Sequence, residues 1–400
     1  MGTMRDKVAI IGMGCTRYDD HFDKTREDLL VEACDEAFKD AGIEAKDIQA
    51  AYLAQAGDTG QPLAHALKLN FIPVSRVENW CATGGDIIRN AAHAVAAGLY
   101  DLVLIAGVKS DTDAGGGKRD PNEDPAPTGP YGEWVLGQET TFAFNAVGTF
   151  ATVATRYMKH YGLTYEQLKT GLGSIAVKNY RNGMLNPRAW LHKDVSMKDY
   201  MEGRTLAWPL GLHDACCQPN GAAAAIITTT ELAKKFRSDY IVLKGNGMSV
   251  GNKLGQLDPN YDFVHFDENL YAAKMAYADA GIRTPLKELD VITMHDAFTV
   301  VELGFYEDMG LAPRGHGGEY AAAGVFSLEG ELPINTQGGL KSFGHGGPSS
   351  GIQKAYEVYK QLQGKSGQRQ VKGATLGMTH DQGGYPGTYS VVLNVWGTRD

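Results

Sequence analysis

Apolar residues along the first part of the chain alternate between short unbroken runs and helical spacing. The run over residues 7–12 is typical of a strand that is buried on both faces. Residues 26–40 carry apolar side chains at helical intervals, and 47–54 form a second strand-like run. This order predicts a βαβ unit. Gly12 and Gly14 form a GxG pair without the rest of a dinucleotide fingerprint, so we expect no nucleotide site there.

The same alternation continues to Gly107. We expect a short helix over 63–69, an extended segment over 73–77 and, after Cys81, a helix that ends near Gly98. A further buried strand is predicted over 102–107. Together these elements predict a mostly parallel sheet with helices on its faces.

The pattern becomes irregular in the middle of the chain. Residues 111–135 are rich in glycine, proline and aspartate, and helices are expected over 140–161 and 165–180. Residues 187–220 show no clear periodicity, and long loops in compact domains usually carry function. We therefore expect 111–220 to be an inserted loop domain that covers the active site.

The second half of the chain repeats the first. Residues 37–43 (AFKDAGI) match residues 276–282 (AYADAGI) at five of seven positions, and a strand-like run over 240–245 precedes the second copy. This spacing is far too long for a solenoid repeat and indicates two related halves packed about a pseudo-two-fold axis. The expected parts are an N-terminal half (1–110 with 221–238), the loop domain (111–220) and a C-terminal half (239–400).

Composition restricts the class of protein. The chain has 400 residues, a formal net charge of −9 and no basic run, which argues against nucleic acid or an anionic membrane as partner. No apolar segment has the length needed to span a bilayer. The five cysteines lack the spacing of a disulfide framework or a zinc site, so we expect a cytoplasmic protein without a metal in this chain.

Cys81 is the strongest candidate nucleophile. It lies at or just before a predicted helix N-terminus, where free backbone N–H groups and the helix dipole favour the thiolate. Gly84 and Gly85 would allow backbone or substrate to approach closely. The alternative is that Cys81 is a small buried apolar residue, as free cysteines often are.

Three histidines lie in predicted turns at the ends of strands or helices. His295 follows a strand and could donate to a developing oxyanion, whereas His345 lies in a glycine-rich loop before a helix and could act as a general base. His380 lies in a His/Gly-rich turn between two strands and is a third candidate for proton transfer. A capping or core role stays open for each. The coincidence of one cysteine and three histidines in such turns favours Cys81 as a nucleophile.

These four segments together resemble the motifs of the thiolase superfamily over nearly the entire chain. The matching segments are the Cys81 turn, His295-Asp296-Ala297-Phe298 in the form seen in archaeal and sterol-carrier-protein-type thiolases, Gly344-His345-Gly346, and His380 to Gly384. The resemblance implies a five-layer αβαβα fold of two duplicated halves with an inserted loop domain. It also implies at least a homodimer and coenzyme A thioester chemistry.

The resemblance further implies roles for individual residues. His345 would deprotonate Cys81, which would attack the 3-keto carbon of a 3-ketoacyl thioester. His295 and His345 would hold the enolate of the leaving thioester, and coenzyme A as co-substrate would release the acyl group. The backbone N–H groups of Cys81 and of a glycine at Gly383 or Gly384 would form a second oxyanion hole.

The sequence departs from the thiolase pattern at the groups that move protons. The C-terminal motif lacks the second cysteine of many thiolases, and His380 is the nearest candidate to replace it. Position 297, where the sterol-carrier-protein type can carry that cysteine, is alanine. The proline of the Gly-His-Pro motif is displaced to Pro348. We therefore expect a thiolase that is specialised away from simple acetoacetyl groups.

The aromatic residues Trp80, Trp190 and Trp208 make the chain similar to thiolases of anaerobic aromatic degradation, such as benzoylsuccinyl-CoA thiolase. Those enzymes and archaeal relatives work with a small OB-fold/zinc-ribbon subunit, so a bulky substrate and such a partner are expected here. The alternatives are an acetyl-CoA C-acetyltransferase in a multi-protein complex, a thiolase-fold aldolase and a non-catalytic acyl-CoA scaffold. The presence of Cys81 disfavours the aldolase, because such relatives can dispense with the nucleophile.

Overall fold

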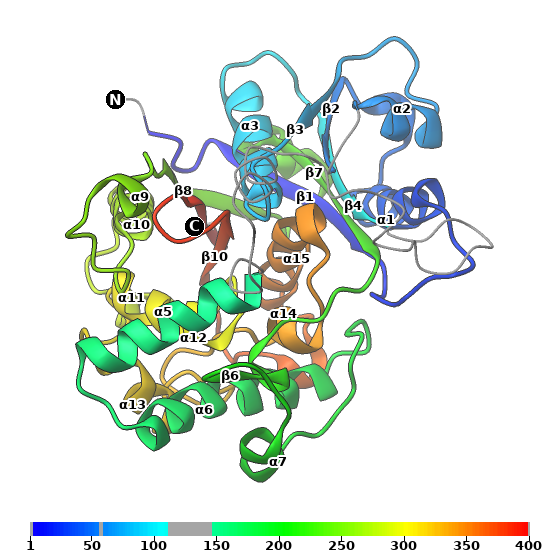
Figure 1. Cartoon of the computed structure of the whole chain (residues 1–400). Coiled ribbons are helices and arrows are strands. Elements are labelled where there is room, and N and C mark those ends of the chain that lie inside the picture. Colours follow the sequence, from blue (N-terminus) through cyan, green and yellow to red (C-terminus); the bar gives the residue numbers. More distant parts are fainter. Residues whose placement is uncertain (1–2, 56–58, 111–145, 399–400) are drawn as a thin grey trace.

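A mixed sheet of nine strands forms the centre of the computed structural model, which describes residues 3–55, 59–110 and 146–398 (Figure 1). Its order is β3-β2-β4-β7-β1-β8-β11-β10-β9. The strands are β1 (Val8–Cys15), β2 (Ala50–Ala54), β3 (Val74–Val77), β4 (Val103–Lys109), β7 (Gly221–Thr229), β8 (Ile241–Val250), β9 (Val291–Thr293), β10 (Leu376–Gly383) and β11 (Ser390–Thr398). The two halves of the sheet meet at β1 and β8, which pair only at Ala9–Val242 and Ile10–Ile241.

The two halves of the sheet share one topology. The order β2-β4-β7-β1 corresponds to β9-β10-β11-β8, and in each set the first two strands are parallel while the other neighbours are antiparallel. The duplication expected from the sequence is therefore confirmed. The expectation of a mostly parallel sheet is wrong, because β7 and β11 run antiparallel to both of their neighbours.

The helices also correspond between the halves. Helix α1 (Arg26–Ala41) follows β1 as α10 (Asp267–Ala280) follows β8, and α3 (Thr83–Ala96) precedes β4 as α15 (Ser350–Leu362) precedes β10. The remaining helices are α2 (Gln61–Leu67), α5 (Ala146–His160), α6 (Tyr165–Met184), α7 (Met197–Glu202), α8 (Thr230–Phe236), α9 (Leu254–Leu257), α11 (Pro285–Glu288), α12 (Thr299–Asp308), α13 (Gly317–Ala322) and α14 (Gly339–Ser342). Short strands β5 (Thr205–Ala207) and β6 (Leu210–Gly211) pair separately.

Helices α3 and α15 form the central layer, because each contacts strands of both halves of the sheet. Successive residues of β1 face opposite layers: Ala9 and Ile11 pack in the core beside α1, whereas Val8 and Ile10 pack in the core beside α3 and α15. Covering on both faces explains the unbroken apolar runs in the sequence. Helix α10 covers the outer face of the second half, which completes the expected five layers.

The GxG pair in β1 allows α1 to pack closely on this strand. A Cβ atom on Gly12 or Gly14 would clash with the backbone of α1, at Ala37 and Ala33 respectively. In the second half Gly245 and Gly247 of β8 make the same close approach to α10. The glycines are therefore explained by two helices lying directly on two equivalent strands.

The region predicted as a loop domain packs over the second half through α6, which contacts α12, α13 and α14. The predicted helix over 165–180 is confirmed as α6, which continues to Met184. The predicted helix over 140–161 corresponds to α5, whose described part begins at Ala146. Residues 111–145 lie outside the described part of the chain. The proposed domain boundaries stay predictions.

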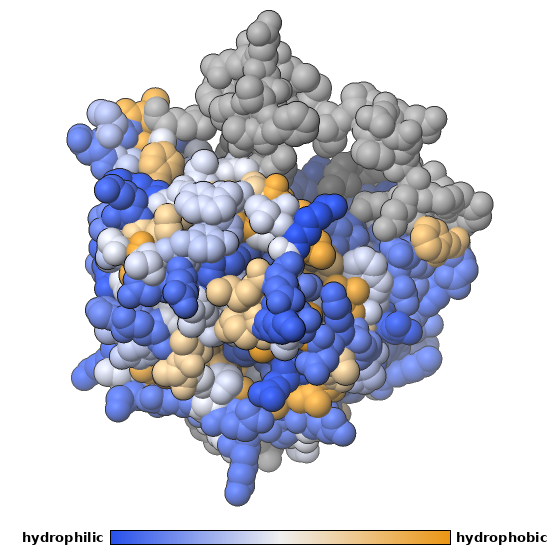
Figure 2. Space-filling view, turned by 60° about the horizontal axis from the view of Figure 1, so that its bottom comes forward, coloured by the Kyte–Doolittle hydropathy of each residue, from blue (hydrophilic) through white to orange (hydrophobic). Residues whose placement is uncertain are grey.

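On the face shown in Figure 2, hydrophobic residues are interspersed with hydrophilic ones. None of the described helices has the length and apolar character needed to cross a bilayer.

Candidate active site

Cys81 lies in a strained turn between β3 and α3. The preceding residue, Trp80, has φ of +55°, a left-handed conformation that is costly for a residue with a side chain. Hydrogen bonds hold this turn: Trp80 N–H donates to Glu78 Oε1 at 2.7 Å, and Asn79 N–H donates to Thr83 Oγ1 at 2.7 Å. The position of Cys81 just before a helix N-terminus agrees with the sequence pattern.

Close contact between two helix ends brings Cys81 and His345 together. A Cβ atom on Gly84, in the first turn of α3, would lie 2.6 Å from the Cα and N atoms of Gly351 in α15. Backbone therefore touches backbone, which requires glycine on both helices. The turn with Cys81 precedes one of these helices and the loop with His345 precedes the other. Gly383 of β10 also lies against the turn, because its Cβ would be 2.9 Å from the N atom of Ala82.

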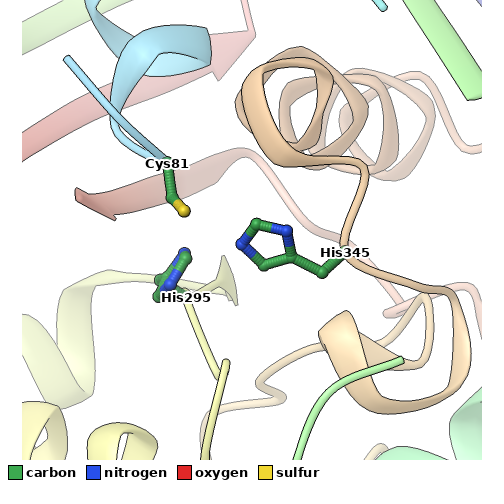
Figure 3. A group of neighbouring side chains, drawn as sticks. All are labelled: Cys81, His295 and His345. Carbon is green, nitrogen blue, oxygen red and sulfur yellow. The ribbon is translucent and has the colours of Figure 1, made fainter. Parts of the chain in front are cut away.

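Cys81, His295 and His345 form one group (Figure 3). The thiol sulfur and one ring nitrogen from each histidine all lie within 4.8 Å of one another. The two ring centroids are 5.4 Å apart and the ring planes are nearly perpendicular, at 86°. Figure 3 shows His295 reaching the thiol from the segment after β9 and His345 from the loop before α15.

These three residues line a cavity of about 170 Å³. Aromatic side chains from separate parts of the chain form much of its wall: Trp80, Phe150, Phe298 and Tyr385. The rings of Phe150 and Phe298 stack with centroids 4.6 Å apart. Gly384, predicted as an oxyanion donor, also lines the cavity and has φ of +92°. The group of Cys81, His295 and His345 thus opens onto a small space with flat apolar walls.

The Cys81 thiol is protonated at rest. Burial first and the nearby Cys216 second raise its pKa, to about 12, although the charge of Lys354 acts in the opposite direction. The expectation that the helix N-terminus favours the thiolate is therefore corrected, because desolvation outweighs the effect of the helix end. For Cys81 to act as a nucleophile, a base has to take the thiol proton.

Both neighbouring imidazoles are neutral. Burial lowers the pKa of His345 to about 3 and holds the pKa of His295 well below its usual value. The Gly347 N–H donates to His345 Nδ1 at 2.9 Å, so the proton of the neutral His345 ring lies on Nε2. His295 Nδ1 is buried without a hydrogen-bond partner among the described residues. Such an atom marks a place that a bound ligand can fill.

His380 lies outside this group. It is inside β10, paired with Leu393 of β11, because the strand continues through the segment predicted as a turn. Its Nδ1 accepts the N–H of His295 at 3.4 Å, its Nε2 contacts Asn269 Oδ1 at 3.4 Å, and its ring packs on Phe305. The side chain is fully buried and does not line the cavity. This placement suits a residue that positions His295.

Asp296 links the segment that carries His295 to residues 340 and 341, which precede His345. Its carboxylate accepts the N–H of Leu340 at 2.6 Å and the side-chain amide of Asn179 at 2.9 Å, and its backbone oxygen accepts from Lys341 Nζ at 3.1 Å. Burial raises the pKa of Asp296 to about 6. The aspartate of the His-Asp motif thus positions the two histidine segments rather than facing the cavity.

Two further groups at the site were not singled out from the sequence. Lys354 of α15 lies 2.5 Å from Asp381, both side chains are fully buried, and the charge of Lys354 lowers the pKa of the Cys81 thiol. Cys216 lines the cavity, and its N–H donates to the backbone oxygen of Ala297 at 2.8 Å. The adjacent Cys216-Cys217 pair was the only sequence signal for it.

A thiol with two neutral imidazoles, held between duplicated α/β halves, suits covalent acyl transfer. Family models described as "Thiolase, N-terminal domain" and "Thiolase C-terminal domain-like" match residues 8–200 and 253–394. The chain belongs to the thiolase family. It is accordingly an acyltransferase that uses coenzyme A as co-substrate.

Individual relatives cover nearly the full length of the chain. An acetyl-CoA acetyltransferase of Methanothermobacter thermautotrophicus is 35% identical over 97% of this chain and 99% of its own. The benzoylsuccinyl-CoA thiolase subunit BbsB of Thauera aromatica is 29% identical over 94% of this chain and 95% of its own. A solved structure described as "Ltp2-ChsH2(DUF35) aldolase" has a TM-score of 0.84 at 24% identity, covering 98% of this chain and 99% of that one, which shows the shared fold.

Proposed function

We propose that the protein cleaves a bulky or aromatic 3-ketoacyl-CoA with coenzyme A through an acyl-enzyme on Cys81. The observation that carries this proposal is the group of Cys81, His295 and His345 facing a cavity with four aromatic side chains in its wall. Flat rings such as those of Phe150 and Phe298 suit contact with a planar acyl group. The similarity to a benzoylsuccinyl-CoA thiolase subunit supports the same substrate class.

His345 is the proposed base for Cys81. Its Nε2 carries the proton while Gly347 donates to Nδ1, so the resting ring is a hydrogen-bond donor towards the cavity. To accept the thiol proton on Nε2, the ring takes the other tautomer and gives up the bond from Gly347. Activation of Cys81 therefore includes a small movement of the loop between His345 and α15.

Two groups of donors stabilise negative charge in this proposal. His295 and His345 hold the enolate oxygen of the leaving thioester, for which the unpartnered Nδ1 of His295 is suited. The backbone N–H of Cys81 and that of Gly383 or Gly384 hold the oxyanion at the carbon under attack. The close approach of Gly383 to the Cys81 turn and the position of Gly384 on the cavity support this second site.

Trapping of the acyl-enzyme tests the proposal. Mixing the protein with a 3-ketoacyl-CoA in the absence of free coenzyme A should add one acyl mass to the Cys81 peptide. Acyl-CoA should also protect Cys81 from iodoacetamide at neutral pH. Cys81→Ser should abolish both signals, whereas Cys217→Ser should retain them, because that sulfur bonds to backbone carbonyls away from the cavity. An inert Cys81 in the wild-type protein would reject the proposal and favour an acyl-CoA scaffold.

A second candidate function is acetoacetyl-CoA thiolysis. The small volume of the cavity, about 170 Å³, and the 35% identity to an acetyl-CoA acetyltransferase favour it. Turnover of acetoacetyl-CoA and of aromatic 3-ketoacyl-CoAs, compared by kcat/KM, separates the two. Retro-aldol cleavage of a 3-hydroxyacyl-CoA that survives Cys81→Ser would instead indicate aldolase chemistry.

Two partners belong to the proposal. Strand β3 is at the edge of the sheet and, within the described residues, pairs only with β2, which leaves an edge that suits pairing with a second copy. The structural neighbour described with a DUF35 component supports a small partner subunit of the OB-fold/zinc-ribbon type. Light scattering of the protein alone tests the homodimer, and a rise in turnover on adding such a subunit tests the second partner.

A further inference from the structure

Cleavage of a 3-ketoacyl thioester leaves a carbanion at C2 that has to gain a proton. The donor must be protonated at neutral pH and must face the cavity that holds the substrate. His380 fails the second requirement, because it lies in β10 with both ring nitrogens in contact with protein groups. His295 is neutral, and the proton that His345 takes from Cys81 returns to Cys81 at the end of the proposed turnover, so neither ring supplies the C2 proton. The acid must therefore come from another residue on the cavity wall.

Cys216 meets both requirements. Its side chain lines the same cavity as Cys81, and the two sulfurs are close enough that ionisation of Cys216 disfavours that of Cys81. Burial raises the pKa of Cys216 to about 11, so the side chain is a thiol at neutral pH. The backbone bond from Cys216 to Ala297 fixes it opposite the His-Asp segment.

Neighbouring groups adapt this thiol to proton transfer. Gln218 donates from Nε2 to the sulfur of Cys216 at 3.4 Å, which stabilises the thiolate formed when the proton leaves. His295 lines the same cavity, and its buried Nδ1, which has no hydrogen-bond partner among the described residues, marks where a substrate oxygen would sit. The adjacent Cys217 differs, because its sulfur is 3.3 Å from the Lys341 carbonyl and does not line the cavity.

We propose that Cys216 is the acid–base residue that protonates C2 of the leaving thioester and removes the C2 proton in the reverse reaction. This inference rests on the proposed function and names a residue outside the four motif segments. It replaces the role that the sequence suggested for His380.

The protons balance over one turnover. His345 takes the proton of Cys81, whose thiolate attacks C3. The C2–C3 bond then breaks, its electron pair goes to C2, and the Cys216 thiol gives its proton to C2. The Cys216 thiolate then regains a proton from solvent, and coenzyme A enters as its thiolate and attacks the acyl group on Cys81. The Cys81 thiolate released in this step regains the proton held by His345.

Deuterium exchange tests the role of Cys216 separately from the nucleophile. In D2O the wild-type protein should exchange the methyl protons of acetyl-CoA, measured by mass spectrometry, and Cys216→Ser should lower this rate by about 100-fold or more. The rate at which acetyl-CoA acylates Cys81 should stay within about threefold of wild type in the same variant, because a serine keeps the local packing. Cys217→Ser is the matched control and should keep both rates.

The outcomes distinguish this inference from the proposed function. Exchange by Cys216→Ser at the rate of the Cys217→Ser control would overturn the role of Cys216 and leave the acyl-enzyme proposal intact. Equal loss of acylation and exchange would also overturn it, because Cys216 would then support the structure of the nucleophile site. A wild-type protein that forms no acyl-enzyme would overturn the proposed function and this inference with it.

Discussion

Replacement of Gly84 by alanine should separate Cys81 from His345 without touching either residue. A Cβ atom at Gly84 would lie 2.6 Å from backbone atoms of Gly351, whereas ordinary contacts begin at 3.4 Å. The partner atoms are backbone in the first turn of α15, so no side chain can rotate away. The helices must therefore move apart by about 0.8 Å at this point, the difference between these two distances.

The magnitude of the effect follows from that displacement. A misplacement of about 1 Å between reacting groups can lower a rate by about 100-fold. Overpacking of this kind costs about 1–3 kcal/mol of stability. The Gly84→Ala protein should therefore stay folded, with an acylation rate of Cys81 that is about 100-fold lower. Because the groups themselves remain, the pH dependence of acylation should keep its shape.

The assay is the rate of Cys81 acylation measured by intact mass, together with the melting temperature. Gly304→Ala is the matched control: this glycine is also in a helix, and a Cβ there would meet nothing within 4 Å. We expect the control to retain full activity and to gain slightly in stability from helix propensity. A Gly84→Ala protein that acylates as fast as the control would refute the idea that the Gly84–Gly351 contact sets the catalytic distance.

Four further predictions concern charge and position. Between pH 7 and pH 5 the free energy of unfolding should fall by about 2 kcal/mol through His345, because its pKa of about 3 in the folded protein lies below the unfolded value of about 6.5. The unfolded chain binds more protons in this range, so this stability is lost as the pH falls below 6.5. Equal free energies of unfolding at the two pH values, measured by urea titration, would contradict the prediction. Lys354→Met should cost about 3–5 kcal/mol by leaving Asp381 buried and unpaired, and an added Asp381→Asn should recover part of that loss in urea midpoints. His380→Asn should slow Cys81 acylation by less than about tenfold, whereas His345→Asn should slow it by about 100-fold or more; equal losses would restore a chemical role to His380. Treatment with EDTA should leave turnover unchanged, and activity that is lost and then restored by Zn²⁺ would show that the Cys81 group holds a metal.

The fold was predictable where burial determines the sequence pattern. The run over residues 7–12 shows a strand because β1 is covered on both faces, and the repeated AxxDAGI segment identifies α1 and α10 as equivalent helices. Strand direction was not predictable in this way. A strand that is buried on both faces has the same apolar run whether its neighbours are parallel or antiparallel, so β7 was not recognised as the strand that reverses direction.

The candidate site was predictable only where local sequence marks the chemistry. Cys81, His295 and His345 stand beside glycines or at the ends of strands and helices, and the structure gathers them into one group. His380 has similar neighbours in the sequence, but its backbone continues in β10, which points the ring into the core. Local pattern cannot separate these cases, because pairing with β11 decides which way the side chain faces.

Cys216 shows why a missing motif residue does not establish a missing function. The N–H of Cys216 bonds to the backbone of Ala297, so a segment from the loop region lies beside the second motif, and both residues line one cavity. A thiol on either of two backbone-paired positions can reach the same space, although 81 residues separate them in the sequence. An alanine at position 297 therefore does not show that the site lacks an acid–base thiol, because a neighbouring segment can supply it. The unusual feature of this site is the part of the chain that supplies the proposed acid, since the proposed nucleophile has the expected place just before α3.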